Sequence, residues 1–167
     1  MKLYNVIFPI WLLWLIPATW VVVLPANFLI DLLVIVLALR SMQVTERKRT
    51  AKSIIWKVWL LGFAADFIGT VLMFMANVLD FGYETPVGKW WYENITNAVS
   101  MNPFENIYAI FWVTACVVVS GCCIYFFNRR IALAKSGLDD AQKKRLALLL
   151  AVCTAPYLFY LPTVWVY

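Results

Sequence analysis

Two aspartates, Asp31 and Asp66, have the strongest potential for chemistry, because each lies inside a long apolar stretch. A carboxylate at the centre of a membrane span costs at least about 2.5–3.5 kcal/mol on insertion scales, so such a residue normally faces a protein interior or a water-filled cavity. Carboxylate oxygens can replace the water around a cation, and a buried carboxyl group can carry a proton. The two aspartates therefore predict a site for a cation or a proton.

The flanking cations predict that both aspartates lie at one depth. Asp31 lies nine residues before Arg40, and Asp66 lies nine residues after Lys57. At a rise of about 1.5 Å per residue, both are about 13–14 Å from the same membrane boundary. Because their helices are expected to be antiparallel neighbours joined by a short connector, we expect the two carboxyl groups to share one level near the midplane.

Further polar residues share the helix faces of the two aspartates. Residues 66, 70, 73, 77 and 80 follow one another at steps of four and three, which is the spacing of one helical stripe. We expect the acid pair to form the centre of a transport pathway, with these residues along it and at its outer mouth: Asn27, Thr70, Asn77, Asp80 and Glu105. The alternative is a structural cluster, in which one aspartate is protonated and hydrogen-bonds to the other or to Asn27.

Other kinds of catalytic site find little support in the composition. The chain has no His, and its four cysteines lie in apolar stretches without forming a C-x-x-C pair. His is the default general base near neutral pH and a common metal ligand, and free cysteine is often a small buried apolar residue. We therefore expect no cofactor, no metal site and no enzymatic activity. An integral membrane enzyme that acts on a lipid or a quinone is a further alternative, against which the lack of His argues.

The overall composition is that of a membrane protein. Of the 167 residues, 64% are apolar and 14% are charged, whereas soluble domains carry roughly 45–50% and about 25%. Four apolar blocks, each long enough to cross a bilayer, predict a single all-α integral membrane domain over residues 1–167: a bundle of four transmembrane helices with an additional half-length or interfacial helix at the N-terminus. The expected spans are residues 17–39, 54–79, 104–127 and 146–167, with connectors at 40–53 and 128–145 and an outer segment at 80–103.

Prolines divide the first apolar block, which covers residues 3–39 and is too long for one span and too short for two. Proline lacks the amide donor and disfavours helix at the preceding residue. We therefore end the half-length helix at residue 15, begin the first span at Pro17 and expect a kink near Pro25. The apolar stretch after Lys2 continues beyond the length of a cleaved signal peptide, so we expect an uncleaved signal-anchor.

Charge distribution predicts the orientation of the chain. Twelve of the 14 Lys and Arg residues lie in or beside the two connectors, which should face the cytoplasm of a plasma membrane. The outer segment and the C-terminus then lie outside, as does the N-terminus unless residues 3–15 form a short additional span. The basic connectors suit anionic lipids or, alternatively, a protein partner. Aromatic residues near the span ends suit interfacial anchoring, or alternatively line a pocket for an apolar or cationic ligand.

Two local patterns predict helices outside the spans. Residues 87–101 in the outer segment suit a short amphipathic helix, and Ser136–Asp140 is typical of a helix start, with acids early and cations later in the sequence.

Together these features predict a small channel or transporter subunit for a cation or a proton. Four spans rarely enclose a pathway alone, so we expect a homo-oligomer or a larger membrane complex, with the lipid bilayer as the surrounding partner. The alternative is a non-catalytic accessory or scaffold subunit of a membrane assembly. The net charge of +5 does not indicate a nucleic-acid-binding domain here, because the apolar composition excludes that class.

Overall fold

The computed structural model describes residues 17–165, with side chains from Trp20 onward, and the elements in this range are helical. Three helices are long and apolar enough to cross a membrane: α1 (Pro17–Ser41), α2 (Arg47–Val78) and α5 (Ile107–Phe127), which continues through a π-helical turn to Ala132. These three overlap the first three expected spans, but α2 begins at Arg47, so most of the expected connector 40–53 is helical and only residues 42–46 join α1 to α2. The expected half-length helix over residues 3–15 lies outside the described residues.

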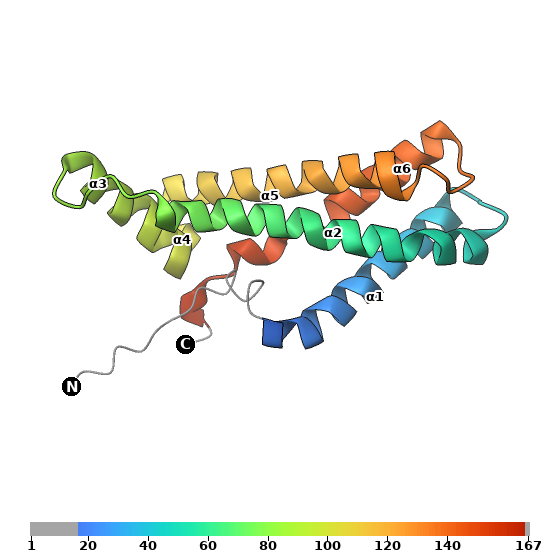
Figure 1. Cartoon of the computed structure of the whole chain (residues 1–167), viewed down its shortest axis with the longest axis horizontal. Coiled ribbons are helices and arrows are strands. Elements are labelled where there is room, and N and C mark those ends of the chain that lie inside the picture. Colours follow the sequence, from blue (N-terminus) through green and yellow to red (C-terminus); the bar gives the residue numbers. More distant parts are fainter. Residues whose placement is uncertain (1–16, 166–167) are drawn as a thin grey trace.

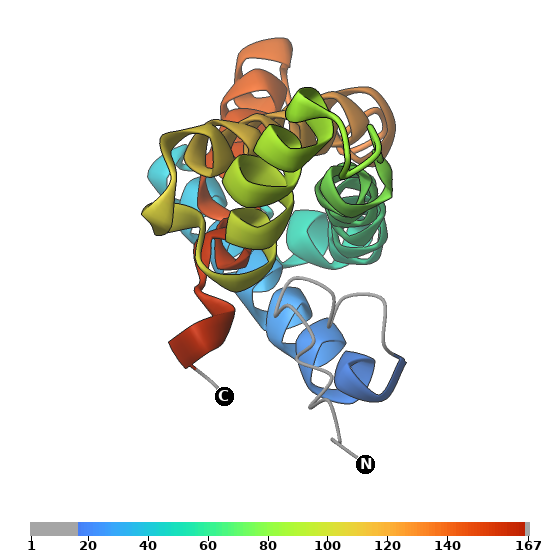
Figure 2. The same ribbon diagram turned by 90° about the vertical axis from the view of Figure 1, so that its left-hand side faces the viewer.

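The long helices form the frame of the molecule. Helices α2 and α5 lie side by side along its long axis, and α6 (Asp140–Cys153) packs against both α5 and α1 (Figure 1). Helix α1 packs against α2 near the basic connector but diverges from the other helices toward its N-terminal end, which is visible in both views (Figures 1 and 2). Side chains still join the two helices there, because Trp20 of α1 makes an edge contact with Phe63 of α2 at 5.5 Å between ring centroids.

Pro25 lies inside α1, where the helix crosses α2. Beside it, the indole N–H of Trp59 donates a hydrogen bond to the carbonyl oxygen of Leu24 at 2.9 Å. Trp56 and Trp59 also make ring contacts with Phe28, with centroids 5.0 and 6.1 Å apart. These contacts attach the proline-containing part of α1 to α2.

The expected fourth span, residues 146–167, is not one continuous helix, and the four-transmembrane bundle is not confirmed. Helix α6 has 14 residues and ends at Cys153, so it is about 21 Å long, short of the roughly 30 Å of a hydrocarbon core. Pro156 explains the interruption, because it lacks an amide donor and disfavours helix at Ala155. Beyond it the chain forms two short 3-10 helices, Tyr157–Tyr160 and Thr163–Trp165.

Two apolar clusters hold the helices together. The first lies toward the basic connectors and joins α1, α2, α5 and α6; its most buried members include Ile35, Leu39, Ile54, Ile124 and Leu146. The second lies toward the other end and joins α2, α5, the outer segment and the chain after α6; it includes Met73, Val99, Val113 and Phe159. Along α2, Asp66 follows Ala65 of the first cluster and precedes Met73 of the second.

The helices outside the spans confirm two local predictions. Residues Pro86–Met101 form α3 (Pro86–Trp91), a π-helical turn and α4 (Asn97–Met101), as expected for residues 87–101. Helix α6 begins with a capping box, in which Asp139 accepts a hydrogen bond from the backbone of Gln142 and the Gln142 side chain accepts one from Asp139.

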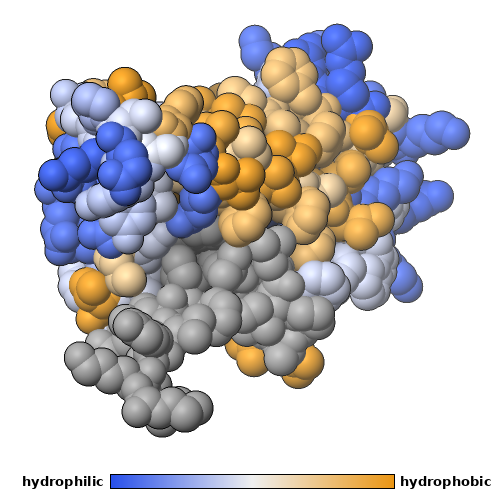
Figure 3. Space-filling model, turned by 60° about the vertical axis from the view of Figure 1, so that its left-hand side comes forward, coloured by the Kyte–Doolittle hydropathy of each residue, from blue (hydrophilic) through white to orange (hydrophobic). Residues whose placement is uncertain are grey.

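Polar residues gather at the two ends of the molecule. Both basic connectors lie at the same end, where the Arg145 guanidinium donates a hydrogen bond to Ser41 Oγ at 3.3 Å. The visible face carries a broad apolar band between two hydrophilic ends (Figure 3). The exposed apolar side chains on α1 and α5, such as Val21, Leu33 and Phe111, fit contact with lipid or with another chain.

Candidate functional site

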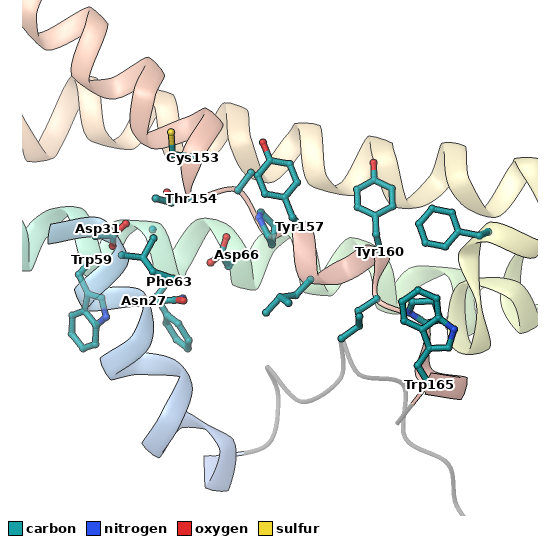
Figure 4. Close-up of a pocket in the computed structure, with 18 residues that line it drawn as sticks. Asn27, Asp31, Trp59, Phe63, Asp66, Cys153, Thr154, Tyr157, Tyr160 and Trp165 are labelled. Carbon is teal, nitrogen blue, oxygen red and sulfur yellow. The ribbon is translucent and has the colours of Figure 1, made fainter. Parts of the chain in front are cut away.

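A cavity of about 480 Å³ lies between α1, α2 and the chain that follows α6 (Figure 4). Its non-aromatic polar residues include Asn27 and Asp31 of α1, Asp66 of α2, and Thr154 at the end of α6. The lining also contains the aromatic residues with polar groups: Trp59, Tyr157, Tyr160 and Trp165. None of the described residues that line it is Lys or Arg. Most of the remaining wall is aliphatic or aromatic. The cavity thus has acidic groups in an apolar wall, with no cationic side chain among the described lining residues to balance them.

Asp31 enters the cavity from α1 and is only 5% exposed. Its Oδ2 lies over Gly62 of α2, where a Cβ atom would come within 3.8 Å of it. Gly62 is near the middle of α2, so Asp31 is at mid-height of this helix. None of the described residues donates a hydrogen bond to the Asp31 carboxyl group. The group therefore lines the cavity with its oxygen atoms available to a ligand.

Asp66 lies one helical turn beyond Gly62 on the same face of α2 and is 4% exposed. Its Oδ1 accepts a hydrogen bond from Ser120 Oγ of α5 at 3.2 Å, and the same hydroxyl lies 3.0 Å from the Ala65 carbonyl oxygen. Asp31 and Asp66 line the same cavity, and two ionised carboxylates at one buried site repel each other. A proton or a cation between them relieves this repulsion.

The end of α6 adds to the negative character of the cavity. Cys153 and Thr154 line the cavity where the helix stops, and a helix C-terminus carries a partial negative charge from its free carbonyl groups. Two of these carbonyls have local donors: Leu150 accepts from Thr154 Oγ1 at 2.8 Å, and Val152 accepts from the Tyr157 hydroxyl at 2.6 Å. The interruption of the helix is thus stabilised by side chains of the segment that follows it.

The structure brings three of the predicted site residues together: Asn27, Asp31 and Asp66 line one cavity. Thr70 lies on the expected stripe but is fully buried, and its hydroxyl donates to the Asp66 carbonyl oxygen of its own helix at 2.9 Å. Thr70 is not among the residues that line the cavity.

The three residues predicted at or near the outer mouth lie at the far ends of α2 and α5, away from the cavity lining. Asn77 accepts a hydrogen bond from Ser100, Asp80 accepts one from the Gly82 amide, and Glu105 accepts one from Asn102. Between them and the acid pair, Met73 is fully buried in the second apolar cluster. In this conformation the stripe is therefore interrupted by packed side chains.

Gly69 explains how tightly this region packs. A Cβ atom at Gly69 would lie 3.0 Å from the ring of Phe159 and 3.1 Å from Ser120 Cβ. The absence of a side chain thus allows both the chain after α6 and α5 to approach α2, one turn from Asp66.

Sequence reasoning missed Ser120. It considered an aromatic-lined pocket only as the alternative to interfacial anchoring, and the lining of the cavity includes the aromatic residues Trp59, Phe63, Tyr157 and Tyr160. Ser120 was visible as a polar residue in an otherwise apolar stretch, but its orientation toward Asp66 depends on the rotation of α5. The tyrosines line the cavity because the chain leaves the helix at Pro156.

The described residues contain no group of three or more His, Cys, Asp or Glu side chains that could hold a metal ion. Comparison with family models, with curated proteins and with solved structures gives no match. The chemistry of the cavity is therefore the basis for assigning a function.

Proposed function

We propose that the chain is a small channel or transporter subunit of a membrane, which moves a cation or a proton past Asp31 and Asp66. The observation that carries this proposal is the pair of buried carboxyl groups in one cavity whose described lining includes no Lys or Arg. Buried acids without a basic partner are costly in a membrane and mark ion or proton pathways in such proteins. A cation or a proton is the natural counter-charge for this cavity.

The position and backbone of the site support the same proposal. Both aspartates lie near the middle of the long helices, and the interrupted helix α6 ends at the cavity. Transporters bind substrates and ions near the midplane, where the C-terminal ends of interrupted helices and unwound carbonyl groups coordinate cations. The end of α6 supplies such a negative helix terminus.

Passage through the site requires a conformational change. The first apolar cluster closes the route toward the basic connectors, and the second closes it toward Asp80 and Glu105. We place the basic connectors in the cytoplasm of a plasma membrane and the outer segment and the C-terminus outside. The exposed apolar faces suit a homo-oligomer or a larger membrane complex.

The second candidate is an accessory or scaffold subunit, and one observation favours it. Asp66 accepts the hydrogen bond of Ser120 and so links α2 to α5. In this case the acid pair would serve packing alone, and its replacement would change assembly without changing ion movement.

The first prediction separates these two functions. Proteoliposomes containing the purified chain should show uptake of sodium, potassium or protons, and Asp31→Asn and Asp66→Asn should each abolish it. Asparagine keeps the shape and an acceptor oxygen but removes the negative charge that binds a cation, so both variants should remain folded. Flux is measured with ion-sensitive dyes inside the vesicles.

The matched control is Glu84→Gln, which removes one negative charge from an exposed turn outside the cavity. This variant should keep the flux of the unmodified chain. Flux that persists in both aspartate variants would contradict the transport proposal. A folded chain without any flux, copurifying with a stoichiometric membrane partner, would favour the accessory function.

A further inference from the structure

The cavity is much larger than an inorganic ion or a proton requires. Its volume is about 480 Å³, whereas one water molecule occupies about 30 Å³ in the liquid. Pockets for small organic molecules range from about 300 to 1,000 Å³ and combine mostly apolar walls with a few polar groups. Size and lining together point to an organic occupant.

Aromatic side chains line the cavity on both sides of the acid pair. Trp59 and Phe63 come from α2, while Tyr157 and Tyr160 come from the chain after α6 (Figure 4). The hydroxyl groups of both tyrosines already donate hydrogen bonds, to Val152 O and to Thr114 Oγ1. Their rings are therefore what they offer to a ligand. Aromatic faces attract organic cations, and the attraction grows when the cation is removed from water.

Charge selects among organic molecules of this size. The lining contributes two carboxyl groups and the negative end of α6, and none of its described residues is cationic. An organic anion would meet repulsion here, and a neutral molecule would leave the aspartates without a counter-charge. A cation whose charge is spread over an apolar body matches both the carboxyl groups and the aromatic rings of the wall.

We infer that the cavity binds a lipophilic organic cation, such as a quaternary ammonium or phosphonium ion, through Asp31, Asp66 and the surrounding aromatic rings. This inference rests on the proposed transport function and names its substrate class. Asp31 and Asp66 supply the counter-charge, and Phe63 and Tyr157 supply aromatic contact.

The test measures binding of radiolabelled tetraphenylphosphonium to the purified full chain in detergent, with empty micelles as background. Tetraphenylborate has the same shape and the opposite charge, so it should not bind. Asp31→Asn and Asp66→Asn should each weaken tetraphenylphosphonium binding at least about tenfold. Phe63→Leu keeps the apolar bulk but removes the ring, and should weaken binding about two- to fivefold. Phe111→Leu replaces a ring on α5 that is 67% exposed and outside the cavity, and should bind as the unmodified chain does.

The outcomes separate this inference from the proposed function. Equal binding of tetraphenylborate, or tetraphenylphosphonium binding that survives both aspartate substitutions, would overturn the organic-cation site. The organic-cation site would also be overturned if the chain failed to bind tetraphenylphosphonium while its sodium, potassium or proton flux depended on the aspartates. In that case the proposed transport function would stand. Binding that needs both aspartates, in vesicles that move neither tetraphenylphosphonium nor inorganic cations, would establish the binding site and overturn transport.

Discussion

Asp31 and Asp66 reach one cavity from different helices. The Asp31 carboxyl group would lie at an ordinary contact distance from a Cβ atom at Gly62, whereas the lack of a side chain at Gly69 lets α5 bring Ser120 to Asp66. The two aspartates differ in their surroundings, because Asp66 accepts a hydrogen bond from Ser120 whereas none of the described residues donates one to Asp31. Asp31 is accordingly the acid with the greater freedom to bind a ligand.

A prediction at the residue scale concerns Ser120. Ser120→Ala removes a single hydroxyl donor that lies within hydrogen-bond distance of both the Asp66 carboxyl group and the Ala65 carbonyl. Hydrogen bonds between helices in membrane proteins average about 0.6 kcal/mol, so the free energy of unfolding should fall by about that amount. It is measured by titration with a denaturing detergent. Ser53→Ala, whose hydroxyl donates only to Thr50 of its own helix turn, should change stability less; an equal loss would show that the link to Asp66 adds nothing.

The spacing of charged residues predicted that the two aspartates lie near each other, but it could not predict how the surrounding side chains are oriented. Counting from Arg40 and Lys57 placed Asp31 and Asp66 at one level, and both line the same cavity. Helical spacing also placed Thr70 on the Asp66 face, but not its packing against neighbouring side chains. The rotation of α5, and with it the position of Ser120, follows from tertiary packing that no single helix encodes.

At the scale of the elements, the interruption of α6 shapes the site. A continuous helix over residues 146–167 would satisfy its backbone internally and present only side chains to α1 and α2. Instead, Pro156 and Pro162 allow the chain to run as short 3-10 turns along the cavity. Irregular backbone at this depth is tolerated where it lies within protein or lines a cavity, and the chain after Cys153 meets that condition.

A prediction for helix packing concerns Gly69. Gly69→Ala places a Cβ atom 3.0 Å from the Phe159 ring and 3.1 Å from Ser120 Cβ. Phe159 is fully buried and cannot move aside freely, so the substitution should lower the free energy of unfolding by about 1–3 kcal/mol. The same detergent titration measures the change.

Gly121→Ala is the matched control, because its Cβ atom would meet Ala151 O at an ordinary 3.6 Å. It should be neutral or slightly stabilising, since alanine favours helix over glycine. A Gly69→Ala variant as stable as Gly121→Ala would contradict the close packing of the chain after α6 on α2.

The apolar stretches predicted the three long helices, including α1, which remains one helix through Pro25. The first three spans have long apolar runs, and α1, α2 and α5 follow them closely. The fourth stretch is also apolar, but Pro156 and Pro162 interrupt its helix. A hydropathy average does not contain this information. The helix start at Asp139 was readable because a capping box depends on local residues alone.

At the scale of the whole molecule, charge divides the two ends. The Lys and Arg residues of the segments 40–52 and 129–145 lie at one end, while Glu84, Glu93 and Glu105 lie toward the other. In a bilayer spanned by the three long helices, these ends face opposite sides.

The corresponding prediction is tested by labelling with a membrane-impermeant maleimide. Lys48→Cys and Lys135→Cys should react from the same side, which the excess of Lys and Arg predicts to be the cytoplasm. Glu84→Cys should react only from the opposite side. The unmodified chain measures the background from its four cysteines. Labelling of Lys48→Cys and Lys135→Cys from opposite sides would contradict the common end of the two connectors.

The short length of α6 has a consequence for how the protein is made. A segment enters a bilayer readily when it forms an apolar helix long enough to satisfy its own backbone hydrogen bonds across the hydrocarbon core. Helix α6 has only 14 residues and is followed by two prolines, so it meets this condition poorly. Helices α1, α2 and α5 precede residues 154–165 in the chain, and they supply the surfaces against which this segment packs. For a chain in a bilayer, we therefore expect this last segment to take its place only after the earlier helices have assembled, with those helices as its template.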